Sequence, residues 1–157
     1  MKLLITGATG FIGKHLLTAL SASEHEVLCA VRRNSGTNEI KESGNIHITK
    51  VDFEDKEFLR QCLTGVDTVI HLAGQMGGYG IPYETFYRTN CELTRSLLDL
   101  AISVGVKHFI YCSTPGVLGF GKRLAREAEP YAPRNPYEQT KVAAEKIVID
   151  TCKENDS

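Results

Sequence analysis

Short apolar runs alternate with longer amphipathic segments along the 157 residues of this chain. A short continuous apolar run bounded by glycine or polar residues is typical of a buried strand, whereas apolar residues three and four apart indicate a helix. The pattern predicts strands at Lys2–Thr6, Glu26–Val31, Ile46–Val51, Thr68–Leu72 and His108–Cys112. It predicts helices at Phe11–Leu20, Asp55–Leu63, Pro82–Val104 and from Pro136 to about Cys152.

Strands that alternate with helices, joined by right-handed crossovers, form a parallel sheet covered on both faces. The predicted fold is therefore α/β, a Rossmann-type doubly wound parallel sheet of about five strands with helices on both faces. Gly65 and Gly105 are expected to end the helices that precede them. The first helix should present one apolar face, made of Phe11, Ile12, Leu16, Leu17 and Leu20. Loops are expected at Arg32–Asn45, Ala73–Ile81 and Ser113–Asn135.

Composition narrows the possible functions. The length suits one domain over residues 1–157, and a formal net charge of −1 lacks the basic excess of a nucleic-acid-binding protein. No apolar run is long enough to cross a bilayer, and Met1-Lys2 leads straight into the first strand, without the pattern of a secretory signal. The five cysteines are odd in number and widely spaced, which indicates a reduced, cytoplasmic setting. Cys29, Cys62 and Cys112 lie in apolar segments and are expected in the core.

A glycine-rich segment, Gly7-Ala8-Thr9-Gly10-Phe11-Ile12-Gly13, directly follows the first expected strand. Between a strand and a helix, such a segment can hold the pyrophosphate of a dinucleotide. Gly7 would permit the tight turn, and Gly10 would let backbone N–H groups approach the phosphates. Gly13 would let the following helix pack close to the strand. The first N–H groups and the positive dipole end of the helix would face the anion. The alternative is an ordinary strand–helix turn.

Tyr137 and Lys141 are four residues apart on the last expected helix, so their side chains share one face. A phenol has an ordinary pKa of about 10, and a neighbouring ammonium group favours its ionised form. Such a tyrosine can take a proton from an alcohol or return one to a carbonyl. The alternative is an exposed surface pair. A hydroxyl at the end of the fifth strand, from Ser113 or Thr114, could join them, or could simply stabilise a turn.

The ordered set of motifs resembles the extended short-chain dehydrogenases/reductases, in particular their NAD-dependent epimerase/dehydratase family. The matching pieces are the glycine segment, Asp52-Phe53, His71-Leu72-Ala73-Gly74, Asn90, Ser113-Thr114 and Tyr137-x-x-x-Lys141. The resemblance covers essentially the whole chain. It implies an NAD(P)-binding Rossmann domain in residues 1–157 that lacks most of the family's carboxyl-terminal substrate-binding region. Leu118 departs from the family pattern, because Val117-Leu118-Gly119 stands where Val-Tyr-Gly is usual.

The resemblance also implies individual roles. Tyr137 would be the general acid/base, and Lys141 would tune it and bind the nicotinamide ribose. Thr114 would hold the substrate oxygen, because the family's active hydroxyl is the second of such a pair. The remaining cofactor contacts would come from Gly7, Gly10, Phe11, Ile12 and Gly13 at the pyrophosphate, Asp52 and Phe53 at the adenine, and Ala73 and Gly74 at the ribose and nicotinamide. Asn90 would support the site, or would be an ordinary polar residue on the helix surface.

Two arginines favour NADP(H) over NAD(H). A carboxylate at the end of the second strand would bind the ribose 2′-hydroxyl, but this chain has Arg32-Arg33 there. Guanidinium groups suit a 2′-phosphate, which they can grip by paired hydrogen bonds. The alternative is a solvated basic loop.

Two hypotheses for function follow. The first is an NAD(P)-dependent epimerase, dehydratase or reductase that acts by hydride transfer on a sugar nucleotide or a similar hydroxyl or ketone substrate. The second is a truncated dinucleotide-binding module without catalysis of its own. The loop at Gly77-Gly78-Tyr79-Gly80 and the segment Phe120–Glu129 are expected to border the substrate. The resemblance further implies a homodimer through the helix at 82–104 and the Tyr/Lys helix. The five histidines are scattered and predict no metal site.

Overall fold

The structure is a computed structural model that describes residues 1–37, 40, 42–119 and 125–155. Parts of two expected features, residues 38, 39 and 41 of the loop at 32–45 and residues 120–124 of the segment at 120–129, lie outside the described residues.

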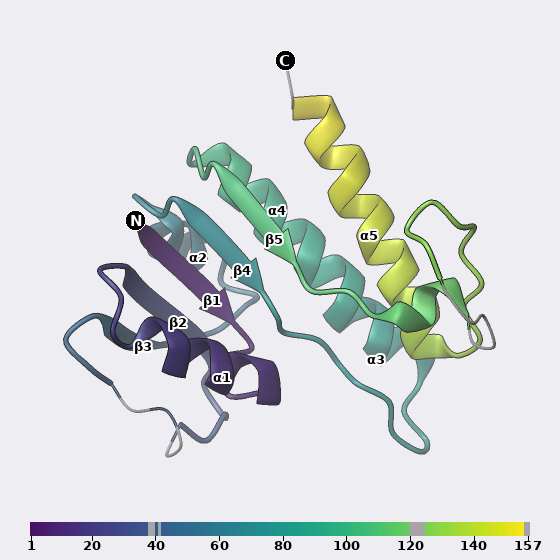
Figure 1. The fold of residues 1–157 in the computed structure, drawn as a ribbon, viewed down its shortest axis with the longest axis horizontal. Coiled ribbons are helices and arrows are strands. Elements are labelled where there is room, and N and C mark those ends of the chain that lie inside the picture. Colours follow the sequence, from purple (N-terminus) through teal and green to yellow (C-terminus); the bar gives the residue numbers. More distant parts are fainter. Residues whose placement is uncertain (38–39, 41, 120–124, 156–157) are drawn as a thin grey trace. The chain divides into compact units, whose positions relative to one another are not determined.

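The central element is a parallel sheet in the order β3-β2-β1-β4-β5 (Figure 1). Its strands are β1 Lys2–Thr6, β2 Glu26–Arg32, β3 Ile46–Val51, β4 Thr68–His71 and β5 His108–Tyr111. Every neighbouring pair runs parallel, including the pairs of β1 with β2 and with β4. This order places β1 and the following turn at the point where the chain reverses direction across the sheet, which is where doubly wound folds bind ligands. The predicted Rossmann-type fold is confirmed.

Seven helical elements accompany the strands in the described part of the chain. They are α1 Phe11–Leu20, α2 Lys56–Leu63, α3 Tyr83–Tyr87, η1 Arg88–Glu92, α4 Leu93–Ser103, η2 Pro115–Leu118 and α5 Pro136–Asn155. The expected helix at 82–104 is helical as predicted, but it contains a π-helical turn, η1, that the sequence pattern did not indicate. Gly65 and Gly105 follow α2 and α4 with φ of 74° and 82°, which confirms their predicted role in ending these helices.

The chain forms two compact units, which are described separately. The sheet unit contains Met1–Ala73 and Ser96–Cys112, and the helical unit contains Gly74–Arg95 and Ser113–Ser157. The strands, α1 and α2 belong to the sheet unit, whereas α3, η1, η2 and α5 belong to the helical unit.

Both faces of the β3-β2-β1-β4 part of the sheet are buried, whereas His108 and Ile110 of the edge strand β5 are exposed. Successive residues of a strand point to opposite faces, so Leu4 packs on one side of the sheet and Leu3 and Ile5 on the other. The Leu4 side is covered by α2 and α4, with Leu59, Leu63, Leu97 and Leu100 in one cluster. The Leu3 side is covered by α1, with Leu17, Val27, Cys29 and Ile46 in a second cluster. Figure 1 shows α1 on the face of the sheet opposite to α2 and α4.

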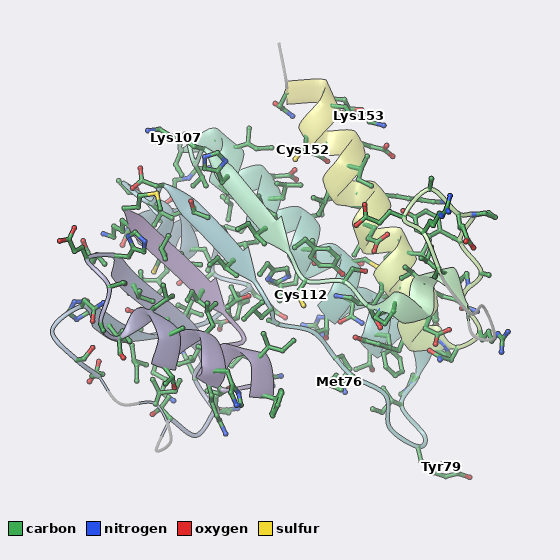
Figure 2. All side chains as sticks on the ribbon, viewed as in Figure 1. Met76, Tyr79, Lys107, Cys112, Cys152 and Lys153 are labelled. Atoms are coloured by element: carbon green, nitrogen blue, oxygen red, sulfur yellow. The ribbon has the colours of Figure 1, made fainter. Side chains whose placement is uncertain are left out.

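Two details of the predicted core are wrong. Phe11 and Ile12 are 80% and 54% exposed, because they lie in the first turn of α1, next to the end of β1, and not in the part that packs along the sheet. Cys29 is buried as predicted and the partly buried Cys62 packs against the core, but Cys112, which follows β5 (Figure 2), is only partly buried. Cys91, which the sequence did not assign to the core, is fully buried. The cysteines are all free thiols.

The helical unit is held by α5, which packs on α3, η1 and η2. Among its described residues, the buried apolar side chains include Phe86, Cys91, Val117, Val142 and Ala144. In the described residues, no helix combines the length and the apolar character needed to cross a membrane.

Candidate functional site

The glycine turn of the sheet unit is closely packed. Gly7 has φ of 72°, and a Cβ built on it would lie 2.6 Å from the backbone nitrogen of Ala73. A Cβ on Gly13 would collide with the carbonyl oxygen of Gly7 and would lie 2.6 Å from Cα of Ala8. The backbone N–H of Gly10 donates to the carbonyl of Gly7 at 3.0 Å and closes the turn. Gly7 and Gly13 therefore allow the turn to fit between β4 and α1.

The amino end of α1 fits a bound phosphate group. Its N-cap is Gly10, and no side chain among the described residues caps the first turn. The first turn also carries no acidic residue that would repel an anion. A Cβ on Gly10 would lie 3.2 Å from the carbonyl oxygen of Gly7, so a larger residue would crowd the turn. The first N–H groups of the helix therefore face outward with the positive end of the dipole.

The other predicted cofactor residues of this unit follow the ends of neighbouring strands. Arg32 is the last residue of β2 and pairs in register with Val51, so it lies beside the start of the segment Asp52-Phe53. Arg32, Arg33 and Asp52 are exposed. Asp52 accepts a hydrogen bond from the backbone N–H of Glu54 at 3.0 Å, and Phe53 packs against the core beneath β3.

A buried threonine links β1 to the end of β4. The Oγ1 of Thr6 lies 2.6 Å from Nδ1 of His71 and accepts a 3.3 Å hydrogen bond from the backbone N–H of Ala73. This network holds the backbone of Ala73 next to Gly7, where the sequence predicts a cofactor contact. Sequence reasoning missed Thr6, because a threonine that ends a strand carries no distinctive signal.

In the helical unit, α5 carries Tyr137 and Lys141. Tyr137 is half-buried, whereas Lys141 is only 4% exposed. Lysines are rarely buried without a partner, so the alternative of an exposed surface pair does not describe this site. Lys141 therefore places an ammonium group inside the unit, one helical turn beyond the phenol-bearing residue.

Thr114 begins η2. Its Oγ1 accepts a 3.4 Å hydrogen bond from the backbone N–H of Gly116, which is the turn-stabilising contact considered as an alternative role. This contact uses the oxygen as an acceptor and leaves the hydroxyl proton as a donor. Thr114 can therefore stabilise the turn and still offer a hydrogen bond to another group.

Asn90 lies at the centre of a polar network in the helical unit. It is 1% exposed and lies in η1, so it is not a polar residue of the helix surface. Its Oδ1 accepts the backbone N–H of Gln75 at 2.7 Å, and its Nδ2 donates to the carbonyl of Gln75 at 3.1 Å and to Oγ1 of Thr140 at 3.0 Å. Thr140 in turn donates to the carbonyl of Tyr137 at 2.9 Å. Asn90 thereby connects the loop after β4 with the turn of α5 between Tyr137 and Lys141.

Asn90, which bonds both partners, lies in the π-helical turn η1. Single π turns inside α-helices frequently occur at functional positions. The hydroxyl of Thr94 donates a hydrogen bond to the backbone carbonyl of Asn90 at 2.7 Å. The neighbouring Cys91 donates its thiol to the carbonyl of Thr140 at 3.2 Å, and burial together with the charge of Glu92 raises the pKa of this thiol to about 11. Sequence reasoning identified Asn90 but missed Thr140.

The predicted site residues fall into two groups. The helical unit contains Asn90, Thr114, Tyr137 and Lys141, and Gly74 adjoins Asn90, because a Cβ on it would lie 3.2 Å from Oδ1 of Asn90. The sheet unit contains the remaining predicted cofactor residues: Gly7, Gly10, Phe11, Ile12, Gly13, Arg32, Arg33, Asp52, Phe53 and Ala73. Among the described residues, no group of three or more His, Cys, Asp or Glu side chains could hold a metal ion.

A model of the NAD dependent epimerase/dehydratase family matches residues 3–157. The chain belongs to this family. The N-acetyl-alpha-D-glucosaminyl-diphospho-ditrans,octacis-undecaprenol 4-epimerase of Escherichia coli O157:H7 is 31% identical over 147 residues, which are 94% of this chain and 42% of that protein. The 3-beta-hydroxysteroid dehydrogenase of Mycolicibacterium neoaurum is 31% identical over 160 residues, again 94% of this chain and 42% of that protein.

A solved structure extends the similarity to the fold. The UDP-glucuronic acid 4-epimerase from Bacillus cereus, in complex with UDP-glucuronic acid and NAD, superposes with a TM-score of 0.87 at 28% identity. The match covers 98% of this chain and 52% of that chain. The chain thus spans about half the length of the curated relatives it matches.

Proposed function

We propose that this chain is the cofactor-binding and acid/base part of an NAD(P)-dependent epimerase, dehydratase or reductase that acts on a sugar nucleotide or a similar hydroxyl or ketone substrate. The observation that carries the proposal is the buried Lys141 one turn from Tyr137, on a helix tied to Asn90 through Thr140. Burying an ammonium group costs desolvation free energy, which favours a role in the chemistry of Tyr137, one turn away, over a purely structural role. The names of the relatives, which include epimerases and dehydrogenases, support the same chemistry.

Residues of the sheet unit would hold the cofactor. The exposed N–H groups at the start of α1 suit the pyrophosphate, and Phe11 and Ile12 offer apolar surface beside it. Asp52 and Phe53 would contact the adenine, and Ala73 the ribose. A bound nicotinamide supplies a two-electron acceptor or donor, and solved relatives with bound NAD support this type of cofactor.

Residues of the helical unit would handle the substrate proton. Tyr137 would take the proton of a substrate hydroxyl, or return one to a carbonyl oxygen. Lys141 would favour the phenolate by its positive charge and would bind the nicotinamide ribose. The hydroxyl of Thr114 would donate a hydrogen bond to the same substrate oxygen and hold it near the phenol.

Within this proposal, the preferred cofactor is NADP(H). Arg32 and Arg33 are exposed at the end of β2, where guanidinium groups can reach a 2′-phosphate. The test is a fluorescence titration of the purified chain with NADPH and, separately, NADH. We expect NADPH to bind markedly more tightly. Equal affinities would overturn the NADP preference, and no binding of either would overturn the cofactor assignment for this chain.

The catalytic part of the proposal needs its own test. The alternative function, a dinucleotide-binding module without catalysis, requires the same glycine turn but has no use for Tyr137. UDP-glucuronic acid and UDP-glucose, which solved relatives bind, are suitable first probes. The product sugar nucleotide is followed by NMR, because an epimerase or a dehydratase returns the hydride and leaves no net reduced cofactor. We expect Tyr137→Phe to abolish turnover while keeping cofactor affinity. Full turnover in this variant would overturn the assignment of Tyr137.

We also propose that residues 1–157 act as one cofactor-binding domain and form a homodimer through the helical segment 82–104 and α5. Ile149 of α5 is 43% exposed, and Tyr83 and Tyr87 of α3 are about 40% exposed, so both elements offer apolar surface. Sedimentation analysis at micromolar concentration tests this proposal. A monomer throughout the concentration series would overturn it.

A further inference from the structure

Glu138 is an acidic residue buried next to Tyr137. It lies in the first turn of α5 and is only 3% exposed. A carboxylate loses much of its hydration at such a position and therefore needs hydrogen-bond donors. Its Oε2 accepts the backbone N–H of Arg134 at 2.6 Å, and the positive end of the helix dipole favours its charge.

Part of this arrangement is a helix cap. The side chain of Asn135 accepts the backbone N–H of Glu138 at 2.9 Å, while Glu138 reaches back to the backbone of Arg134. The pattern Asn135-x-x-Glu138 is thus a variant of the capping box. In the standard box, the side chain of the fourth residue accepts the backbone N–H of the first, whereas here Glu138 accepts the N–H of Arg134, one residue earlier. A cap, however, requires no burial of the carboxylate and no contact with another segment.

Glu138 also contacts a second segment, the η2 helix. A Cβ built on Gly116 would lie 2.8 Å from Oε1 of Glu138, 2.9 Å from its Cγ and 3.0 Å from its Cδ. Three atoms along the side chain, not only its tip, occupy the space beside Gly116. Because Oε2 is bonded to the backbone of Arg134, the side chain cannot simply swing away.

Gly116 in turn holds Thr114. Its backbone N–H donates to Oγ1 of Thr114, and η2 is attached to the segment before α5 by the hydrogen bond from Ala132 N–H to the carbonyl of Val117 at 2.8 Å. Glu138 therefore touches the residue that fixes the Thr114 hydroxyl, and it does so from the helical turn that carries Tyr137.

We propose that Glu138 is a positioning residue, which sets the orientation of the Thr114 hydroxyl relative to Tyr137 by packing its buried carboxylate against Gly116. The inference rests on the proposed function, since that function assigns the substrate oxygen to Thr114 and the proton to Tyr137. Glu138 touches neither substrate nor cofactor in this role. It acts through Gly116 and the Thr114 side chain.

The test measures the side-chain rotamer of Thr114 directly. Three-bond NMR couplings to the γ-methyl carbon of Thr114 report its χ1 populations in the full 157-residue chain, without cofactor or substrate. We expect one rotamer in the unaltered chain, loss of this single-rotamer pattern in Glu138→Ala, and retention in Glu138→Gln, whose amide oxygen can accept the same hydrogen bond. Asn135→Ala is the matched control, because it removes a cap from the same helix end without altering the contact with Gly116. It should lower Tm and leave Thr114 in one rotamer.

Gly116→Ala gives an independent arm in case Glu138→Ala fails to fold. Its methyl group meets the Glu138 side chain and should displace η2, so Thr114 should again lose its single rotamer, whereas the neighbouring Pro115→Ala should not have this effect. An unchanged Thr114 pattern in Gly116→Ala, or in a folded Glu138→Ala, would reduce Glu138 to a helix cap and overturn the proposal. Because the readout needs no bound cofactor, a failed NADPH titration would count against the proposed function alone.

Discussion

The side-chain amide of Asn90 bonds both the N–H and the carbonyl of Gln75, at 2.7 Å and 3.1 Å, as a neighbouring strand would. A single buried residue thus fixes the backbone of the loop that follows β4. Since the same amide also donates to Thr140, the loop and α5 share one anchor within the helical unit.

Replacing Asn90 should therefore destabilise the helical unit. Asn90→Ala removes three hydrogen bonds in a buried region and leaves their partners unsatisfied, which should lower the free energy of unfolding by about 2–4 kcal/mol. Urea denaturation measures this change. Gln75→Ala is the control, because Asn90 contacts only the backbone of Gln75, and its effect should stay within about 0.5 kcal/mol. Equal losses in the two variants would contradict the anchoring role.

The sequence predicted the elements better than it predicted their junctions. Apolar periodicity located the strands, because each is short, apolar and followed by a turn signal, and it located α1 from Phe11 to Leu20. It did not predict the π turn around Asn90, since the spacing of Phe86 and Leu93, the apolar residues on either side, also fits an uninterrupted α-helix. Phe11 and Ile12 follow the apolar periodicity of α1, yet their position in its first turn leaves them exposed.

The candidate site shows the same limit. Tyr137 and Lys141 were found from a four-residue spacing, but the burial of Lys141 depends on packing that no local pattern contains. Glu138 could have been found from sequence, because Asn135-x-x-Glu138 is a helix-start signature. Its contact with Gly116 could not, because it joins segments that are separated by about twenty residues and meet only in the fold.

Gly13 should be intolerant of any side chain. Within a helix, alanine normally stabilises relative to glycine by about 1 kcal/mol. At Gly13 the added methyl would collide with the carbonyl of Gly7 and the Cα of Ala8, both backbone atoms that cannot rotate away. Gly13→Ala should therefore destabilise the chain by about 1–3 kcal/mol and weaken NADPH binding at least tenfold. Thermal unfolding and fluorescence titration provide the two measurements.

Gly36 supplies the control for Gly13. It is exposed, and a Cβ built on it would have no heavy atom of the described residues within 4 Å. Gly36→Ala should therefore leave both Tm and NADPH affinity close to those of the unaltered chain. A Gly13→Ala variant that matches Gly36→Ala in both measurements would show that α1 can move away from the turn at little cost.

The buried thiol of Cys91 predicts a loss of stability in alkaline solution. Burial, with a further contribution from the charge of Glu92, raises the pKa of Cys91 from 9.0 to about 11. The folded state therefore keeps a proton that the unfolded chain loses, so stability is unaffected below pH 9 and falls as pH rises from about 9 towards 11. Tm measured at intervals between pH 8 and pH 10.5 should fall less steeply in Cys91→Ala.

Cys29 provides a comparison in the sheet unit, because burial raises its thiol pKa to about 11 as well. Cys29→Ala should flatten the alkaline fall to a similar degree, and the double variant should flatten it further. Identical alkaline slopes in all these variants would contradict the assignment of the fall to buried thiols.

Arg33 should distinguish the two nicotinamide cofactors. A guanidinium bonded to the 2′-phosphate contributes about 1.5–3 kcal/mol, which corresponds to about a 10-fold to 100-fold change in Kd. Arg33→Ala should therefore weaken NADPH binding by at least tenfold and leave NADH binding unchanged, because NADH lacks the phosphate. The exposed Lys153 of α5 offers a control of equal charge, and Lys153→Ala should alter neither affinity. If Arg33→Ala and Lys153→Ala weaken NADPH binding equally, the effect comes from net charge. If Arg33→Ala weakens NADH binding as much as NADPH binding, Arg33 contacts a part of the cofactor that both molecules share.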